Sequence, residues 1–287
     1  MSSKKIIFIA DVFAEDVLGG GELNNEEAIR LLKSEGYSVL KCRSKDVTIN
    51  FLEKQKNVFL IVANFIELNN NVKLYIQDLA YIIYEHDHKY LKTRNPEDYP
   101  RFIAPHNDIV NRAFYENSNA VLVQSRLHKE IIDKNLHLKT TINLAGNLWS
   151  PSCLKLLSKY SKVKKKKKCA IISSPIWHKN TIGSIRYCVE NNLPYELIEN
   201  SDYHSFLKEM GECESFVFFP QTTETLSRVV VEARMMGLEV FTHPNVGAMS
   251  EPWINLKGDA LINVMLDKRK SILNKITSAI SSSDSSS

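Results

Sequence analysis

The chain has 287 residues, of which 44% are hydrophobic and 24% are charged, and its formal net charge is +4. This composition is typical of a soluble globular protein with about two domains, and so small a net charge gives no reason to expect general nucleic-acid binding. The five cysteines lack C-x-x-C spacing, so we expect reduced thiols in a cytoplasmic protein. No signal peptide and no apolar run near the ~18 residues of a membrane span is visible, so we expect at most a peripheral contact with a membrane.

The first predicted elements are a strand, a glycine-rich loop, a helix and a second strand. They cover Lys5–Asp11, a loop ending in Gly19-Gly20-Gly21-Glu22, Leu23–Ser34 and Tyr37–Lys41. This is a mononucleotide-type βαβ start, although the G-x-G-x-x-G fingerprint of dinucleotide-binding domains is absent. Glycines permit close approach of the backbone, and the helix start can face a phosphate or a sugar hydroxyl. The alternative is a flexible loop without a ligand.

Val58–Phe65 and Tyr81–Tyr84 are predicted as further strands, and the second runs into Glu85-His86-Asp87-His88. Polar residues at strand ends in such a sheet point toward the ligand. His86, Asp87 and His88 could bind a metal, but consecutive strand residues alternate faces, so at most two would converge. The other interpretations are a contact of His86 with a ligand, with Asp87 orienting it or binding a hydroxyl, and a plain solvated loop.

The rest of this domain, which we place at residues 1–150, contains a long loop and two more helix–strand pairs. Lys89–Arg101 has no periodicity and is predicted as a loop above the N-terminal sheet that contacts a ligand. The elements after it are predicted at Ile109–Tyr115 (helix), Ala120–Gln124 (strand), Leu127–Asn135 (helix) and Thr141–Leu144 (strand).

A lysine-rich stretch, Lys162–Lys168, lies in a predicted linker at residues 151–168. Such runs repel themselves and are usually solvated. This one could also attract an anionic membrane surface, at about 1 kcal/mol per nearby lysine. Aromatic residues are not interleaved with the lysines, so the stacking pattern of single-strand nucleic-acid binders is missing and we expect no nucleic-acid partner.

The second domain is predicted at residues 169–280, followed by a disordered tail at Ser281–Ser287. Its elements before the main motif are predicted at Cys169–Ser174 (strand), Thr181–Asn191 (helix), Tyr195–Ile198 (strand) and Tyr203–Met210 (helix). After the motif we expect a segment Ile254–Leu266 and a separate final helix near Lys268–Ile280.

The most informative stretch is Phe216–Glu251, which reads as strand, polar turn, helix, strand and loop. Glu224 lies at the entrance of the helix and Glu232 lies two turns later. The residues between them would supply the free N–H groups of a helix start, which bind anions. A carboxylate on each side of such a start suits a nucleotide-sugar, whose pyrophosphate lies between the ribose and hexose hydroxyls.

The segment FFPQTTETLSRVVVEARMMGLEVFTHPNVGAMSE resembles the donor-binding segment of the retaining GT-B glycosyltransferases of family 4. Their EX7E motif is a pair of glutamates with seven residues between them, followed by Ala, a Gly, a strand and a Gly-containing loop. The matching positions are Glu224, Glu232, Ala233, Gly237, Thr242, Gly247 and Glu251. Ser227 stands where the family usually has Gly, and Thr225 where it often has one. The other interpretation is an ordinary surface-charged helix of a doubly wound domain.

This resemblance implies an α/β fold of the GT-B type, with two Rossmann-like domains facing each other across a cleft. It implies transfer of a sugar from a nucleotide-sugar, most simply a UDP- or GDP-sugar, with retention of configuration and without a metal or other cofactor. The acceptor, bound by the N-terminal domain, would be a glycan, a lipid-linked sugar or a precursor of a cell-surface polysaccharide.

The resemblance also implies roles for single residues. The catalytic set would be Glu224 and His86, which contact the hexose, and Lys179, which binds the diphosphate. Glu232 would hold the ribose, and further donor contacts are expected from Gly20, Gly21, Asn180, Leu226, Ser227, Arg228 and Gly247. Asp87 and Glu22 are the expected acceptor contacts. The family's arginine earlier in the Lys179 loop is absent, because Ser173–Ile176 occupy that region.

Two other classes of function remain open. One is a nucleotide-sugar epimerase or hydrolase on the same fold. The other is a catalytically inactive GT-B-like binding protein, for which the missing arginine is the main argument.

Overall fold

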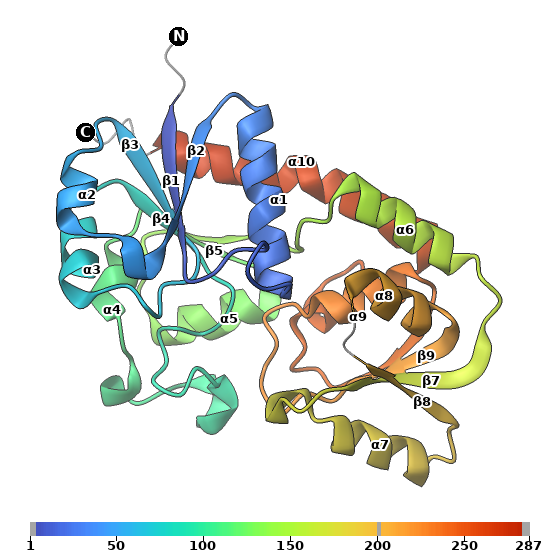
Figure 1. Cartoon of the computed structure of the whole chain (residues 1–287). Coiled ribbons are helices and arrows are strands. Elements are labelled where there is room, and N and C mark those ends of the chain that lie inside the picture. The colour runs from blue at the N-terminus through green and yellow to red at the C-terminus, as the bar shows by residue number, and fades with distance from the viewer. Residues whose placement is uncertain (1–3, 200–201, 283–287) are drawn as a thin grey trace. The chain divides into compact units, whose positions relative to one another are not determined.

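The computed structural model describes residues 4–199 and 202–282, and the chain divides into two compact units. Unit 1 comprises Met1–Leu148 and Arg269–Ser287, and unit 2 comprises Trp149–Lys268. Each unit has its own parallel β-sheet with helices on both faces (Figure 1).

Unit 1 contains a six-stranded sheet with the order β2-β1-β3-β4-β5-β6. The strands are β1 Lys5–Ala10, β2 Ser38–Arg43, β3 Val58–Val62, β4 Tyr81–Tyr84, β5 Ala120–Val123 and β6 Thr141–Asn143. The connecting helices are α1 Gly20–Ser34, α2 Ile49–Glu53, α3 Asn70–Ile76, α4 Arg112–Glu116 and α5 Arg126–Asn135. These helices supply the crossover connections that parallel neighbours require.

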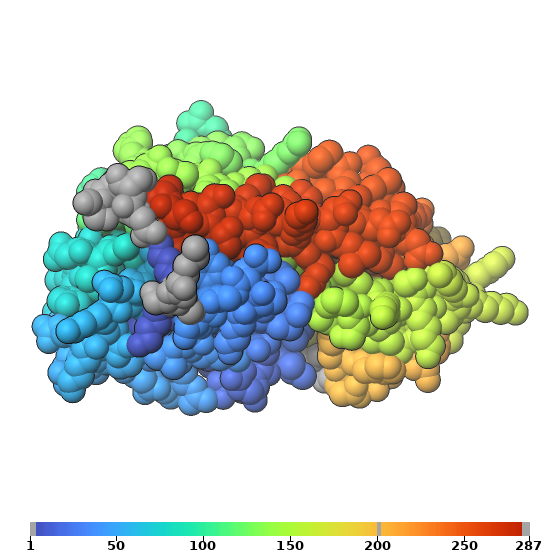
Figure 2. Space-filling view, turned by 90° about the horizontal axis from the view of Figure 1, so that it is seen from above, coloured from blue at the N-terminus to red at the C-terminus, as the bar shows by residue number. Residues whose placement is uncertain are grey.

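Successive residues of the unit 1 strands alternate between two apolar layers. On β1, Ile6 and Phe8 belong to a layer that includes α1 and the last turns of α10 (Gly258–Ser282). Ile7 and Ile9 belong to the opposite layer, which includes α2, α3, α4 and α5. Figure 2 shows the dark-red end of α10 lying along the blue segment that contains α1. The sheet is therefore buried on both faces, as parallel sheets usually are.

Unit 2 contains a four-stranded parallel sheet with the order β10-β9-β7-β8. The strands are β7 Lys166–Ser173, β8 Tyr195–Glu199, β9 Cys213–Val217 and β10 Glu239–Phe241. The helices are α6 Pro151–Ser161, α7 Thr181–Glu190, α8 Tyr203–Gly211, α9 Arg228–Met235 and the first part of α10. The larger apolar cluster joins α6, α8, α9 and α10, whereas α7 covers the other face (Figure 1).

The final helix differs from the prediction of a separate element near Lys268–Ile280. α10 is continuous, because apolar residues recur at helical spacing on both sides of the charged segment 267–270. Arg269, in that segment, pairs with Glu27 of α1, and the helix from Arg269 onward belongs to unit 1. Ser281 and Ser282 are helical rather than part of a tail, and residues 283–287 lie outside the described residues.

The linker predicted at residues 151–168 is also wrong, because most of it is regular structure. The Ser150 side chain caps α6 by accepting a hydrogen bond from the Cys153 amide, and Pro151 occupies the first turn. Leu154 and Leu157 then enter the core of unit 2. β7 begins at Lys166, inside the lysine-rich stretch.

The lysine-rich stretch is held by partners within unit 2. Lys165 Nζ donates to the main-chain carbonyls of Tyr160 (2.8 Å), Met236 (2.9 Å) and Gly211. Other lysines of the stretch form ion pairs with carboxylates: Lys162 with Asp259, Lys166 with Glu196 and Glu212, and Lys168 with Glu196. Apart from the half-buried Lys165, the lysines of the stretch are exposed, as a solvated run predicts, and the membrane contact stays a prediction. No helix within residues 4–199 and 202–282 has the length and apolar character needed to cross a membrane.

Candidate functional site

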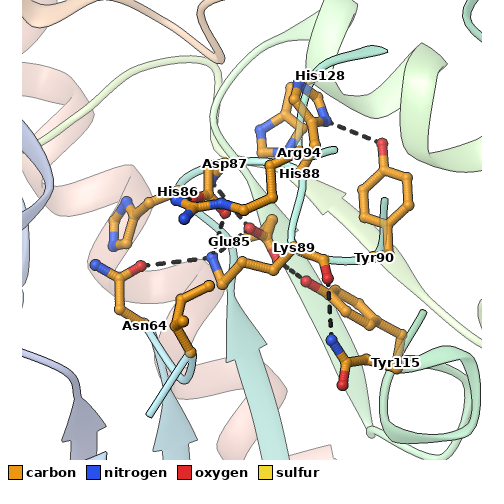
Figure 3. A network of polar contacts seen from close by, with 12 residues as sticks. Asn64, Glu85, His86, Asp87, His88, Lys89, Tyr90, Arg94, Tyr115 and His128 are labelled. Carbon is orange, nitrogen blue, oxygen red and sulfur yellow. Dashed lines mark hydrogen bonds and ion pairs between the residues drawn. The ribbon is translucent and has the colours of Figure 1, made fainter. Parts of the chain in front are cut away.

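In unit 1, the residues that follow β4 form a network of charges around the buried pair Glu85 and Lys89 (Figure 3). Lys89 Nζ lies 2.5 Å from Glu85 Oε1 and 2.8 Å from Asp87 Oδ1. Asp87 also pairs with Arg94, and Glu85 accepts a hydrogen bond from the Tyr115 hydroxyl. We call these five residues the strand-end network.

Burial and charge oppose each other in the strand-end network. Burial alone would lower the pKa of Lys89, but the carboxylates of Asp87 and Glu85 raise it. Burial raises the pKa of Glu85 to about 7, against the attraction of Lys89. Burial would also raise the pKa of Asp87, but Lys89 and Arg94 lower it. Both carboxylate oxygens of Asp87 are thus paired with cations of unit 1. The sequence predicts Asp87 as an acceptor contact but does not predict these ion pairs.

His86 is fixed by hydrogen bonds on both ring nitrogens. Gln124 Nε2 lies 2.6 Å from His86 Nδ1 and therefore donates to it, so that His86 Nε2 carries the proton and donates to Asn25 Oδ1 at 2.6 Å. Burial and the charge of Lys89 lower the pKa of His86 to about 3. The ring also packs against Gly21, where an added Cβ would lie 3.7 Å from His86 Cγ. The neutral His86 ring is thus held beside the start of α1 by Asn25 and Gln124, which the sequence analysis did not single out.

The glycines predicted as a loop form the first turn of α1, which begins at Gly20 rather than Leu23. Glu22 folds back over this turn, so that a Cβ atom added to Gly19 would collide with Glu22 Oε2. Burial raises the pKa of Glu22, and Asn64 Nδ2 lies 3.5 Å from its Oε1. The positive end of α1 therefore already faces a carboxylate of its own first turn.

His88 and His128 lie on the other side of the strand-end network. Their rings are 5.0 Å apart, and His88 Nδ1 lies 2.9 Å from the Tyr90 hydroxyl. The Nε2 atom of each is buried without a hydrogen-bond partner among the described residues. In the described part of the chain, no group of three His, Cys, Asp or Glu side chains is placed to hold a metal ion.

We expect the buried histidines to make the protein acid-sensitive. His86 and His88 have folded pKa values of about 3 against an ordinary value of 6.5, because burial disfavours their charged forms. Unfolding therefore takes up protons between these values, and the free energy of unfolding falls as the pH falls from 6.5, by about 1.4 kcal/mol per pH unit for each histidine. Glu85, with its raised pKa, acts in the opposite sense below pH 7.

A single substitution separates these contributions. Urea denaturation of wild type and His88→Gln between pH 6.5 and 5 should show a shallower pH dependence in the variant, by about 1.4 kcal/mol per pH unit. Equal slopes for the two proteins would show that His88 is not buried in its neutral form.

In unit 2, the turn between β7 and α7 presents Lys179 to the segment after β9. Asn180 has a left-handed backbone (φ 51°), caps α7 through the Gly183 amide and donates to the Phe219 carbonyl at 2.7 Å. Lys179 Nζ then lies 2.9 Å from Glu224 Oε1. Both residues come from the carboxyl ends of neighbouring parallel strands, where ligands bind in such sheets.

The segment around Glu224 is tied to the loop after β10. The Glu224 amide donates to the Asn245 carbonyl (3.1 Å), and its carbonyl accepts from the Gly247 amide (2.8 Å). The Leu226 carbonyl accepts from the Ala248 amide at 2.9 Å, and the Leu226 side chain is fully buried. Gly247 and Leu226 therefore build the frame that fixes Glu224.

Ser227 stands at the start of α9 in a left-handed conformation with φ 71°. This backbone favours glycine, which explains why the resembled family usually has Gly there. Its hydroxyl does not cap the helix, and Oγ is buried without a hydrogen-bond partner among the described residues. The N-terminus of α9 thus has, beside its main-chain amides, a serine hydroxyl that makes no hydrogen bond to the described residues.

Ser227→Gly should be more stable than Ser227→Ala by about 1 kcal/mol, since both variants lose the hydroxyl but only glycine is unstrained at a positive φ. Urea denaturation of the two variants measures the difference. If the alanine variant were the more stable, the left-handed backbone at Ser227 would be refuted.

Glu232 is buried in a cluster with Trp149, Tyr203 and Arg228. Glu232 Oε1 accepts from Trp149 Nε1 (2.8 Å) and from the Tyr203 hydroxyl (2.6 Å), and Arg228 Nε lies 3.4 Å away. The Arg228 guanidinium stacks 4.4 Å from the centre of the Trp149 ring, and its side chain is only 8% exposed. The Arg228 side chain is therefore engaged by Glu232 and Trp149 of the same unit. The sequence does not predict the contacts of Trp149 and Tyr203 with Glu232, because both residues are far from Glu232 along the chain.

No family model and no curated protein matches the chain. Among solved structures, it is similar to an alpha-glucosyltransferase in complex with UDP and a 13-mer DNA containing an HMU base, with a TM-score of 0.55 and 11% identity over 98% of this chain and 100% of that one. It is also similar to HepE of Anabaena in complex with UDP and glucose, with a TM-score of 0.53 and 15% identity over 97% and 95% of the two chains. At such low identity the likeness shows the fold alone: the chain has the α/β GT-B fold that the sequence predicted.

Proposed function

We propose that the protein is a glycosyltransferase that takes its sugar from a nucleotide-sugar and that unit 2 binds this donor. The observation that carries the proposal is the start of α9, where Ser227 Oγ is buried without a hydrogen-bond partner among the described residues. Ser227 follows Glu224, which pairs with Lys179, by three residues and precedes Glu232 by five. Main-chain amides, a hydroxyl and an ammonium group around one helix start suit a diphosphate. The similar structures that contain UDP support UDP as the first nucleotide to test.

In the proposed reaction the bond between the anomeric carbon and the diphosphate oxygen breaks, and its electron pair leaves with the diphosphate. The acceptor oxygen bonds to the anomeric carbon, and its proton passes to the departing diphosphate. Lys179 and the first turn of α9 stabilise the charge that develops on the leaving group, with no cofactor. Attack on the leaving-group face gives retention of configuration and needs no protein nucleophile.

The remaining donor contacts that we propose lie in unit 2. Glu224 accepts hydrogen bonds from hydroxyls of the transferred sugar. The three contacts of Glu232 described above all use Oε1, and we assign its Oε2 to the ribose hydroxyls. Asn180 acts through its side chain, which caps α7 and donates to the Phe219 carbonyl next to Lys179. Leu226 and Gly247 act through their backbones, which fix Glu224, and Arg228 contributes its main-chain amide as the first residue of α9.

The resemblance extends the proposal to His86. Its neutral ring, which packs against Gly21, contacts the transferred sugar. Among the expected acceptor contacts, Glu22 is favoured over Asp87, because the oxygens of Asp87 already pair with Lys89 and Arg94. The acceptor that we propose is a sugar hydroxyl of a glycan or a lipid-linked precursor.

Thermal denaturation of the purified protein with UDP, GDP and ADP tests the donor site. A ligand that binds only the folded protein stabilises it by about 2.7 kcal/mol at roughly 100-fold excess over Kd. We expect one nucleotide to raise the Tm, and Lys179→Met to lose most of that shift. No shift with any of the three at millimolar concentration would overturn the proposal. Transfer assays then compare glycan and lipid-linked acceptors with DNA containing an HMU base, which one similar structure contains.

A further inference from the structure

Lys179 and Glu224 form an ion pair in the proposed donor site. Nζ and Oε1 are 2.9 Å apart, and the side chains keep 30% and 18% of their surface exposed. The backbones on both sides are fixed, since the Gln221 amide donates to the His178 carbonyl (2.8 Å) and the Glu224 amide to the Asn245 carbonyl (3.1 Å). Fixed backbones keep the ammonium and carboxylate groups close together, and a ligand can reach both groups.

When a diphosphate binds, the ammonium group of Lys179 has two possible negative partners, Glu224 and the diphosphate. A diphosphate that binds at the start of α9 competes with Glu224 for Lys179. It also brings a second negative group next to the carboxylate, and like charges this close repel each other. The binding energy of any nucleoside diphosphate therefore depends on whether Glu224 finds a new hydrogen-bond donor when it loses Lys179.

The attached sugar changes this balance. A free nucleoside diphosphate ends in a phosphate monoester, which carries about −1.5 to −2 charges at neutral pH, whereas in the nucleotide-sugar that phosphate is a diester without the second ionisation. The sugar also brings hydroxyls that can donate to Glu224 in place of Lys179. Glu224 would thus be satisfied in the donor complex and left opposite a more negative phosphate in the product complex.

We propose that Glu224 selects the intact nucleotide-sugar over the free nucleoside diphosphate and so favours release of this product after transfer. The selection rests on the proposed function. It makes Glu224 a specificity-determining residue through its charge, in addition to its contact with the sugar.

Titration calorimetry with UDP and UDP-glucose on wild type and Glu224→Gln tests the selection. The variant keeps the shape of the side chain and removes its charge. We expect UDP to bind at least about threefold more tightly, because Lys179 is released from a partly exposed ion pair. UDP-glucose should bind more weakly because its hydroxyls lose a charged acceptor, so the ratio of the two Kd values should change by about tenfold or more.

Two control variants separate charge from other effects. Glu224→Asp keeps the negative charge and should retain the preference for UDP-glucose. Glu196→Gln removes a carboxylate that pairs with Lys166 and Lys168 in the same unit, and it should leave both affinities unchanged. A Kd ratio in Glu224→Gln equal to that of wild type would overturn the selection while leaving the donor site intact. Failure of wild type to bind UDP, GDP or their sugars would instead overturn the proposed function and the selection with it.

Discussion

Glu232→Ala should destabilise the protein by about 3–5 kcal/mol, because it removes the carboxylate that pairs with the buried Arg228 guanidinium. The Trp149 and Tyr203 donors would also lose their shared acceptor. Urea denaturation followed by circular dichroism measures the change. A loss below about 1 kcal/mol, the range of an exposed ion pair, would contradict the buried cluster.

The same cluster decides which variant can test nucleotide binding. Glu232→Ala would lose binding through destabilisation alone, so its failure to bind would say nothing about the ribose. Glu232→Gln keeps an oxygen for Trp149 and Tyr203 and is the informative variant. Glu196→Ala, which removes a surface carboxylate of unit 2, is the matched stability control and should cost less than about 1 kcal/mol.

Lys165→Met should lower the free energy of unfolding by about 3 kcal/mol, because one ammonium group serves carbonyls at the ends of three helices. These carbonyls belong to Tyr160 near the end of α6, Gly211 at the end of α8 and Met236 after α9. Lys167→Met removes the same charge from an exposed position of the same stretch and should change stability by less than about 0.5 kcal/mol. Urea denaturation of both variants makes the comparison, and equal effects would show that the three contacts contribute nothing.

The alternating pattern of strands and helices made much of each unit predictable. Buried apolar runs such as Lys5–Ala10 and Tyr81–Tyr84 became strands, because a parallel sheet covered on both faces needs continuous apolar segments. The errors lie where local signals were misjudged. Pro151 marked the first turn of a helix rather than a linker, and the helix predicted from Ile109 begins at Arg112, after a left-handed Asn111.

The candidate site was predictable only where its residues follow the ends of neighbouring parallel strands. Lys179, Glu224 and Ser227 follow strand ends, and the topology of a parallel sheet brings such positions together. The partners that fix the site come from distant segments: Gln124 and Asn25 on His86, and Trp149 and Tyr203 on Glu232. No spacing rule links these pairs, since only the three-dimensional packing makes them neighbours.

The most direct test of the donor site is a crystal structure of the protein with UDP bound. We expect the diphosphate at the start of α9, with phosphate oxygens within hydrogen-bond distance of Lys179 Nζ and Ser227 Oγ. We also expect Glu232 Oε2 to accept hydrogen bonds from the ribose hydroxyls. A nucleotide bound away from α9, or a diphosphate that leaves Lys179 paired only with Glu224, would contradict the account.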